Sequence, residues 1–172
     1  MQQAESDQVR RAARGDRTAF AALAGAHWPG LVGLARSVVG EAAAEDVVQD
    51  ALIVAWRKLG SLRDPTAFSA WLTRIVLNQC LRRKRRWRDW LPIGAVAEPA
   101  FEASPQAELD LERCLNCLAP RQRAVMYMTI VEGRTDSEIA ALMRITKASV
   151  RSHRRRARQR LNQLLNGANH VS

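Results

Sequence analysis

The stretch that decides the fold runs from residue 135 to residue 161 and reads TDSEIAALMRITKASVRSHRRRARQRL. Thr135 and Glu138 have the spacing of a capping box, in which each side chain satisfies a free backbone amide at the start of a helix. A short helix over residues 138–143 is therefore expected, then a three-residue turn and a long helix capped by Thr146. The predicted inner face of the long helix is Val150, Ala157, Leu161 and Leu164 or Leu165. A short helix, a tight turn and a long basic helix form the helix-turn-helix arrangement.

The long helix is rich in arginine, and this composition points to a DNA contact. The second helix of a helix-turn-helix enters the major groove, and its first two turns reach the edges of the bases. Arginine binds guanine through two acceptors, and serine contacts a base or a phosphate. The candidate contacts in those turns are Lys147, Ser149, Arg151, Ser152, Arg155 and Arg156. Arg158 and Arg160 lie further along and are expected to contact phosphates or solvent. The alternative interpretation is a solvated basic helix.

The charge of the whole chain supports a nucleic-acid partner. Its 172 residues carry 27 Lys and Arg against 17 Asp and Glu, which gives a formal net charge of +10. Residues 1–86 carry 14 basic and 8 acidic side chains, residues 87–112 carry 1 and 6, and residues 113–172 carry 12 and 3. Two basic blocks therefore flank an acidic strip. Arginine greatly outnumbers lysine, and its planar guanidinium favours phosphates and base edges.

Nothing in the sequence predicts export or membrane insertion. No window approaches the roughly 18 uncharged apolar residues of a membrane span. The N-terminus lacks the basic-then-apolar pattern of a signal peptide. We therefore expect a soluble, cytoplasmic protein whose partner is nucleic acid rather than a membrane surface.

Helical periodicity dominates the chain, and no alternating strand pattern is convincing. In the first half we expect a short helix capped by Ser6, then an apolar-periodic helix over residues 20–40 that Pro29 kinks or splits. A third helix over residues 42–58 would end at a cap formed by Gly60.

A fourth helix is expected to begin at Asp64 and Pro65, which have the pattern of a cap and a first-turn proline. Its apolar stripe is Phe68, Trp71, Leu72, Ile75, Val76 and Cys80, and its other side presents Arg74, Asn78, Arg82 and Arg85. It ends in six positive charges over residues 82–88. Trp87 and Trp90 flank this run, where they either stack on unpaired bases or dock on the chain that follows. Trp56 and Trp71 lie on apolar stripes and are expected in the core.

Proline, glycine and scattered glutamate after Pro92 predict a flexible acidic linker over residues 93–107. Beyond it we expect one helix over residues 108–118 and another over residues 120–131, ahead of the helix-turn-helix. The predicted fold class is therefore all-α. Two small helical domains, residues 1–92 and residues 108–172, are joined by the flexible acidic linker.

Three cysteines, Cys80, Cys114 and Cys117, are too few for a disulfide framework. Cys114 and Cys117 have the spacing of two metal ligands, but no second pair follows and the histidines form no matching set. Packing as small apolar groups explains both thiols more simply. No metal and no other cofactor is predicted.

These segments together resemble the bacterial RNA polymerase sigma factors of the extracytoplasmic-function group, within the sigma-70 family. The first half shows AEDVVQDA at residues 44–51, AWR at residues 55–57, Phe68, WLTRI at residues 71–75 and Asn78 ahead of the arginine run. The second half shows LAPR at residues 118–121, EG at residues 132–133, EIA at residues 138–140, SVRS at residues 149–152 and RAR at residues 156–158. The motifs follow the family's order over nearly the whole chain, so the resemblance is specific.

The resemblance implies an alternative, regulated factor that binds core RNA polymerase and directs it to promoters. Residues 1–92 would be sigma region 2 and residues 108–172 sigma region 4, with the linker near the polymerase active-site channel. Core polymerase would bind Asp46, Gln49 and Asp50. The minus-ten element would bind Ser61, Arg63, Asp64, Arg74, Asn78, Arg82 and Arg85. The minus-thirty-five element would bind the six residues of the last helix, Lys147, Ser149, Arg151, Ser152, Arg155 and Arg156. An anti-sigma factor, often membrane-bound in this group, would hold the protein inactive.

The sequence departs from the family pattern at three places. Ala148 and Ser149 replace a usual Gly-Thr pair, and the serine keeps the hydroxyl. Arg134 and Arg154 stand where apolar residues are usual. These two arginines leave the local packing of the second domain open, with contact to DNA or to an inhibitor as the alternative.

Two other functional classes are alternatives. An enzyme acting on DNA needs a nucleophile or clustered carboxylates for metal-assisted chemistry. Asp46 and Asp50 share one helix face, but no histidine or further acid is placed to complete a site, so we do not predict an enzyme. A stand-alone helix-turn-helix regulator would bind duplex DNA and would need no face for docking on polymerase.

Overall fold

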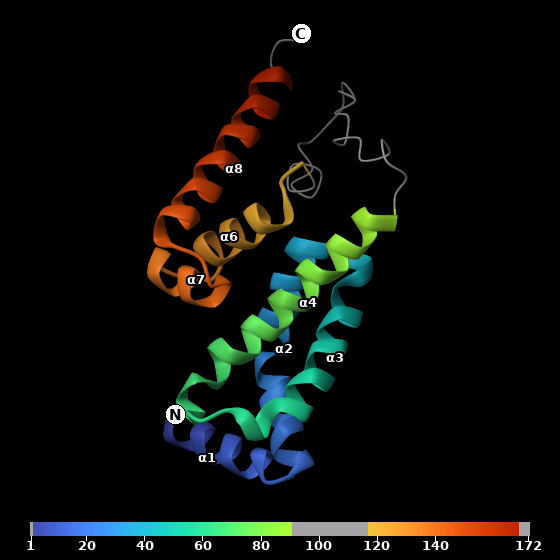
Figure 1. Cartoon of the computed structure of the whole chain (residues 1–172), viewed down its shortest axis with the longest axis vertical. Helices are drawn as coiled ribbons and strands as arrows, with labels where there is room; N and C mark the ends of the chain where they lie inside the picture. Colours follow the sequence, from blue (N-terminus) through green and yellow to red (C-terminus); the bar gives the residue numbers. More distant parts are fainter. Residues whose placement is uncertain (1, 91–116, 169–172) are drawn as a thin grey trace. The chain divides into compact units, whose positions relative to one another are not determined.

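The computed structural model describes residues 2–90 and 117–168, and all regular structure in these ranges is helical (Figure 1). The chain divides into two compact units, Met1–Arg82 and Arg83–Ser172, and each is described by itself. The predicted all-α class is confirmed. The predicted linker over residues 93–107, most of the helix predicted over residues 108–118 and the domain boundary at residue 92 lie outside the described residues.

The first unit is built around two long neighbouring helices. These are α2 (Arg17–Val39) and α3 (Glu41–Lys58), which pack side by side and are joined at Gly40. Gly40 has a φ of +91°, a conformation that a residue with a side chain rarely adopts. The N-terminal helix α1 (Gln2–Ala13) packs against α2. Two short 3₁₀ turns, η1 (Leu59–Ser61) and η2 (Pro65–Ala67), connect α3 to α4 (Phe68–Trp90).

Helix α2 shows how local signals and burial act together. The Asp16 side chain caps its start by accepting a hydrogen bond from the backbone N–H of Ala19 at 2.9 Å. That bond, followed by the bond from Arg11, lowers the pKa of Asp16. Pro29 lies on the exposed side of the helix and does not split it, because burial of Leu23 and Leu34 holds the flanking turns in place.

By length and composition alone α2 is apolar enough to cross a membrane, so the prediction that no such stretch exists is wrong. A helix in the core of a soluble protein passes the same test. In this unit Leu23, Leu34 and Val38 of α2 are buried. The apolar character of α2 therefore serves the core of the first unit.

Two predicted helix ends are wrong. Ser6 is buried inside α1, which already begins at Gln2, so it caps nothing. Gly60 is not a helix cap, because α3 ends at Lys58 and Gly60 lies within η1. The predicted start at Asp64 and Pro65 is confirmed: Asp64 caps η2, which leads directly into α4.

The core of the first unit draws on every one of its helices. On α4 the predicted stripe is buried at Phe68, Leu72, Val76 and Cys80, and Leu77 joins it. Trp56 and Trp71 are half-buried rather than fully enclosed. The Trp56 ring packs on Phe20, with ring centroids 5.1 Å apart.

The second unit contains α6 (Pro120–Ile130), α7 (Asp136–Met143) and α8 (Lys147–Ala168) among the described residues. Its core includes Met128, Ile139, Val150 and Ala157, and Leu161 packs at its edge. The inner face predicted for α8 is therefore confirmed at the positions whose side chains are described. The turn between α7 and α8 passes through Arg144, whose φ of 54° lies in the left-handed region.

Both predicted caps of the helix-turn-helix are confirmed. The hydroxyl of Thr135 accepts from the backbone N–H of Glu138, and the Glu138 carboxylate accepts from the backbone N–H of Thr135 at 2.8 Å. At the next helix, Thr146 accepts from the backbone N–H of Ser149 at 3.1 Å. The bonds of Glu138 to the Thr135 hydroxyl and amide lower the pKa of the Glu138 carboxyl.

Candidate functional site

The outer side of α3 carries the first candidate surface. Asp46, Gln49 and Asp50 are all exposed, because Val47, Val48, Ala51 and Ala55 bury the opposite side of the helix. Ile53 continues the same exposed side three residues after Asp50 and is 52% exposed. We call Asp46, Gln49, Asp50 and Ile53 the acidic face. Sequence reasoning missed Ile53, although its spacing from Gln49 and Asp50 places it there.

The second candidate surface is the loop at residues 61–64, which runs from the last residue of η1 to the residue before η2. Ser61, Arg63 and Asp64 are exposed. Ser61 donates its hydroxyl proton to the Lys58 carbonyl at 2.7 Å. One oxygen of Asp64 accepts from the Thr66 hydroxyl at 2.7 Å and from the Thr66 amide at 2.9 Å, and these bonds lower the pKa of Asp64. Asp64 thus shapes the loop, and Arg63 extends from it.

Helix α4 adds a polar strip next to this loop in sequence. Arg74, Asn78, Arg82 and Arg85 are spaced by four, four and three residues, which places them along one side of the helix. Asn78, Arg82 and Arg85 are exposed, while Arg74 is half-buried. The side chains of Trp87 and Trp90 lie outside the described residues, so their predicted roles stay predictions.

The third candidate surface is the start of α8. Lys147, Arg151 and Arg155 are exposed and recur every four residues along one side, and Arg156 is exposed next to them. Ser149 and Ser152 are half-buried. The Ser149 hydroxyl lies 2.9 Å from the Thr146 hydroxyl, so Ser149 takes part in the helix cap.

His153 on α8 was not among the predicted contacts. It is half-buried, and burial together with the positive charges of Arg121 and Arg156 lowers its pKa. Arg121, at the start of α6, therefore acts electrostatically on the same part of α8. A lowered pKa keeps His153 neutral at neutral pH, so it adds no charge to this basic helix.

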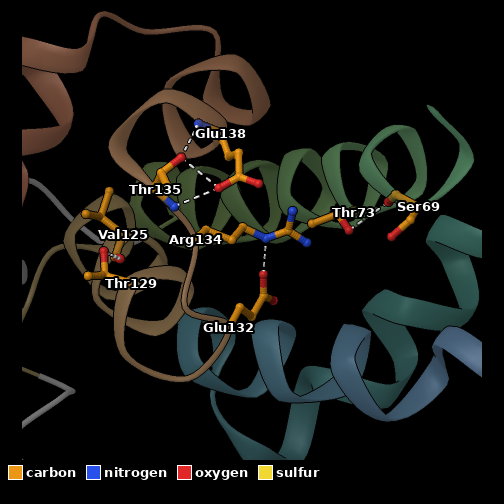
Figure 2. Close-up of polar contacts among 8 residues, drawn as sticks. All are labelled: Ser69, Thr73, Val125, Thr129, Glu132, Arg134, Thr135 and Glu138. Atoms are coloured by element: carbon orange, nitrogen blue, oxygen red, sulfur yellow. Dashed lines mark hydrogen bonds and ion pairs between the residues drawn. The ribbon is translucent and has the colours of Figure 1, made fainter. Parts of the chain in front are cut away.

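Over residues 117–168, the acids of the second unit bind partners within the same unit. Glu132 pairs with Arg134, and Glu138 binds Thr135 in the capping box (Figure 2). Asp136 accepts two hydrogen bonds from the Arg154 guanidinium, at 2.6 and 3.3 Å. The two arginines at unusual positions therefore each hold an acid of the same unit. The partner of Arg154 was not predictable from the sequence because Asp136 lies 18 residues away.

The cysteines and acids form no metal site in the described ranges. No group of three or more His, Cys, Asp or Glu side chains that could hold a metal occurs there. Cys80 is buried, and this burial raises the pKa of its thiol to about 12. Cys117 is half-buried and free, and Cys114 lies outside the described residues.

Comparison with known proteins identifies the family of the chain that carries these surfaces. The Sigma-70 region 2 family matches residues 23–90, and the Sigma-70 region 4 family matches residues 108–161. The chain is 36% identical over 156 residues to "ECF RNA polymerase sigma factor SigM" of Mycobacterium tuberculosis, covering 88% of this chain and 79% of that one. It is 34% identical over 173 residues to "RNA polymerase sigma factor CnrH" of Cupriavidus metallidurans, covering 90% and 91%.

Solved structures agree with these matches. CnrH in complex with the cytosolic domain of CnrY has a TM-score of 0.67 at 28% identity and covers 95% of this chain and 98% of that chain. RpoE in complex with the anti-sigma factor NepR from Bartonella quintana has a TM-score of 0.60 at 33% identity, covering 80% and 91%. The chain belongs to the sigma-70 family of RNA polymerase sigma factors, in the extracytoplasmic-function group. The sigma-factor interpretation is thus confirmed over a stand-alone regulator.

The Asp136–Arg154 pair yields a prediction about stability. Both side chains are about one-quarter exposed, so Asp136→Ala leaves a half-buried guanidinium without its partner. We expect a loss of about 1 to 2 kcal/mol, between the values for exposed and buried pairs, in chemical denaturation. In an Arg154→Leu background the same substitution should cost less than about 0.5 kcal/mol, because the pair is already gone. An equal cost in both backgrounds would contradict the pairing.

Proposed function

We propose that this sigma factor binds core RNA polymerase through the acidic face of α3. The observation that carries the proposal is the exposure of Asp46, Gln49 and Asp50 on one side of a helix in a protein of net charge +10. Carboxylates repel DNA phosphates, so this face suits a protein partner with a basic surface. Ile53 adds an apolar side chain that water solvates poorly.

The loop at residues 61–64 and the polar strip of α4 would bind the minus-ten element. Ser61, Arg63 and Asp64 would surround an unstacked base, since contacts to the base edge and backbone offset the loss of stacking. The polar strip of α4 would then contact the DNA strand next to that base through Arg74, Asn78, Arg82 and Arg85. Because Asp64 is already hydrogen-bonded to Thr66, its proposed role is to shape the loop.

The start of α8 would read the minus-thirty-five element in duplex form. Lys147, Arg151 and Arg155 share the exposed side that a recognition helix turns to the major groove. Arg156 would neutralise phosphate, and Ser149 and Ser152 would contact the backbone or a base at close range. In this arrangement residues 1–92 act as region 2 and residues 108–172 as region 4.

Regulation, location and chemistry complete the proposal. The solved relative RpoE is seen with the anti-sigma factor NepR, which supports control of this chain by an inhibitor of that kind. The protein would act in the cytoplasm, without inserting into a membrane, and would catalyse no reaction of its own. The acidic linker over residues 93–107 would run near the polymerase active-site channel, where its charge resembles that of nucleic acid.

Promoter-directed transcription tests the proposed function. Purified core polymerase, with and without this chain, is given promoter fragments from the source genome, and discrete transcripts are mapped. A specific transcript that requires the chain is expected. The absence of both a specific transcript and binding to core polymerase would refute the function.

The acidic face is tested in the same assay by Asp50→Arg. We expect core affinity to fall by about 100-fold or more, because the new cation faces a basic surface. Asp7→Arg is the matched control: it makes the same change of charge at an exposed position on α1. Unchanged core affinity for Asp50→Arg, with an unaltered melting temperature, would show that the docking face lies elsewhere.

Base reading by α8 is tested with Arg155→Ala. If Arg155 contacts a base, binding to the promoter should weaken by about 1 to 3 kcal/mol while binding to unrelated DNA changes little. Arg158→Ala, which removes an exposed arginine one turn later, should lower both affinities alike. An equal loss on all sequences for Arg155→Ala would assign it to the phosphate backbone.

A further inference from the structure

Helix α1 lies outside the residues matched by the region 2 family, which begin at residue 23. It is nevertheless part of the first unit's core. Ser6, Val9 and Ala12 are 4%, 2% and 2% exposed, so one side of α1 is buried along its length. A helix that only extended the chain would not bury this face.

Helix α1 covers the elements that flank the loop at residues 61–64. It packs against α2, against η1 and against η2. The loop at residues 61–64 begins at the last residue of η1 and ends directly before η2. Figure 1 shows α1 crossing the end of the first unit at which α3 passes into α4.

A polar contact and a ring contact extend this arrangement. Glu5 of α1 lies 2.9 Å from Nε2 of His27 on α2. The His27 ring packs on Phe68, with ring centroids 5.6 Å apart. Phe68 is the first residue of α4 and is almost fully buried. Glu5 is thus connected through His27 to the residue at which α4 begins.

The loop's own hydrogen bonds are short-range. Ser61 bonds to Lys58, and Asp64 bonds to Thr66, so these contacts span three and two residues. Bonds of this kind fix the shape of each turn but not the distance and angle between the turns. Helix α1 touches both turns from outside the loop.

We propose that α1 positions the loop at residues 61–64 for binding the minus-ten element, with Val9 and Glu5 as positioning residues. By holding η1 and η2 at a fixed separation, α1 keeps the loop open to a single unstacked base. This inference rests on the proposed function of the loop. It assigns a role in promoter binding to a segment that touches no DNA in the proposal.

The test compares two buried valines in the complete chain bound to core polymerase. Val9→Ala and Val38→Ala remove the same two methyl groups from positions that are 2% and 0% exposed. Val38 lies at the far end of α2, beside Gly40 and away from the loop. The probe is a fluorescent single strand carrying the non-template minus-ten segment of the promoter found in the transcription assay.

Val9→Ala should lower affinity for this strand by about fivefold, while core affinity stays within about twofold. Val38→Ala should leave both affinities within about twofold, even if it lowers the melting temperature as much as Val9→Ala does. Equal strand affinities for the two variants would overturn the proposal. A wild-type chain that yields no transcript would instead refute the proposed function.

A second pair of variants leaves the core intact. Glu5→Ala removes the contact to His27 from a side chain that is 41% exposed, and should weaken strand binding by about twofold to threefold. Asp7→Ala is its control, because Asp7 is exposed on the same helix and forms an ion pair with Arg10 of α1. Loss of strand affinity in both variants, or in neither, would count against a specific role of Glu5.

Discussion

Each long helix of this protein must bury one apolar side, and that burial determines which side chains remain to meet DNA or another protein. On α3 the buried side is made of small residues such as Ala51 and Ala55, which lets the helix lie close to α2. The side chains that remain outside are mainly acidic up to Asp50, and Arg57 and Lys58 follow in the last turn. On α8 the buried side is Val150, Ala157 and Leu164, and what remains outside is basic. The division of charge between surfaces therefore follows from the packing of the helices.

The acids described in the second unit, Glu132, Asp136 and Glu138, are all bonded to groups of that unit. Asp136 lies in the first turn of α7, where a carboxylate stabilises the helix dipole. An unpaired carboxylate close to a DNA-binding helix would repel phosphate. Pairing with Arg154 retains the benefit to the helix and removes much of the repulsion. Arg154, in turn, is held by the fold and is not expected among the DNA contacts.

Signals confined to a few residues were predictable from the sequence. The capping box at Thr135, the cap at Thr146 and the start at Asp64 depend on neighbours within three residues, and all three are confirmed. Ser6 and Gly60 have equally favourable chemistry for caps, but burial of α1 and the 3₁₀ turn after α3 override it. The path of α2 through Pro29 likewise depends on burial that no local pattern reveals.

The features that were not predictable join distant parts of the chain. The pairing of Asp136 with Arg154 spans 18 residues, and the contact of Glu5 with His27 spans 22. The family's motifs singled out the residues of α3 and the loop, and the helix-turn-helix pattern singled out those of α8. The structure exposes all of them except Ser149 and Ser152, which are half-buried. It could not be seen from those motifs that α1 packs on the turns beside the loop, because α1 precedes them all.

In the proposed function, the loop at residues 61–64 and the start of α8 lie at different promoter elements. Cleavage of promoter DNA by an iron chelate tethered to an introduced cysteine tests it directly. Cutting by the wild-type chain treated with the same chelate, which reports on the native Cys80, Cys114 and Cys117, is subtracted as background. Gly60→Cys suits the loop because a Cβ there meets no atom within 4 Å, and Ala148 is exposed at the start of α8. In the complex with core polymerase, Gly60→Cys should cut at the minus-ten element and Ala148→Cys at the minus-thirty-five element. Cutting of one and the same element from both positions would contradict the account.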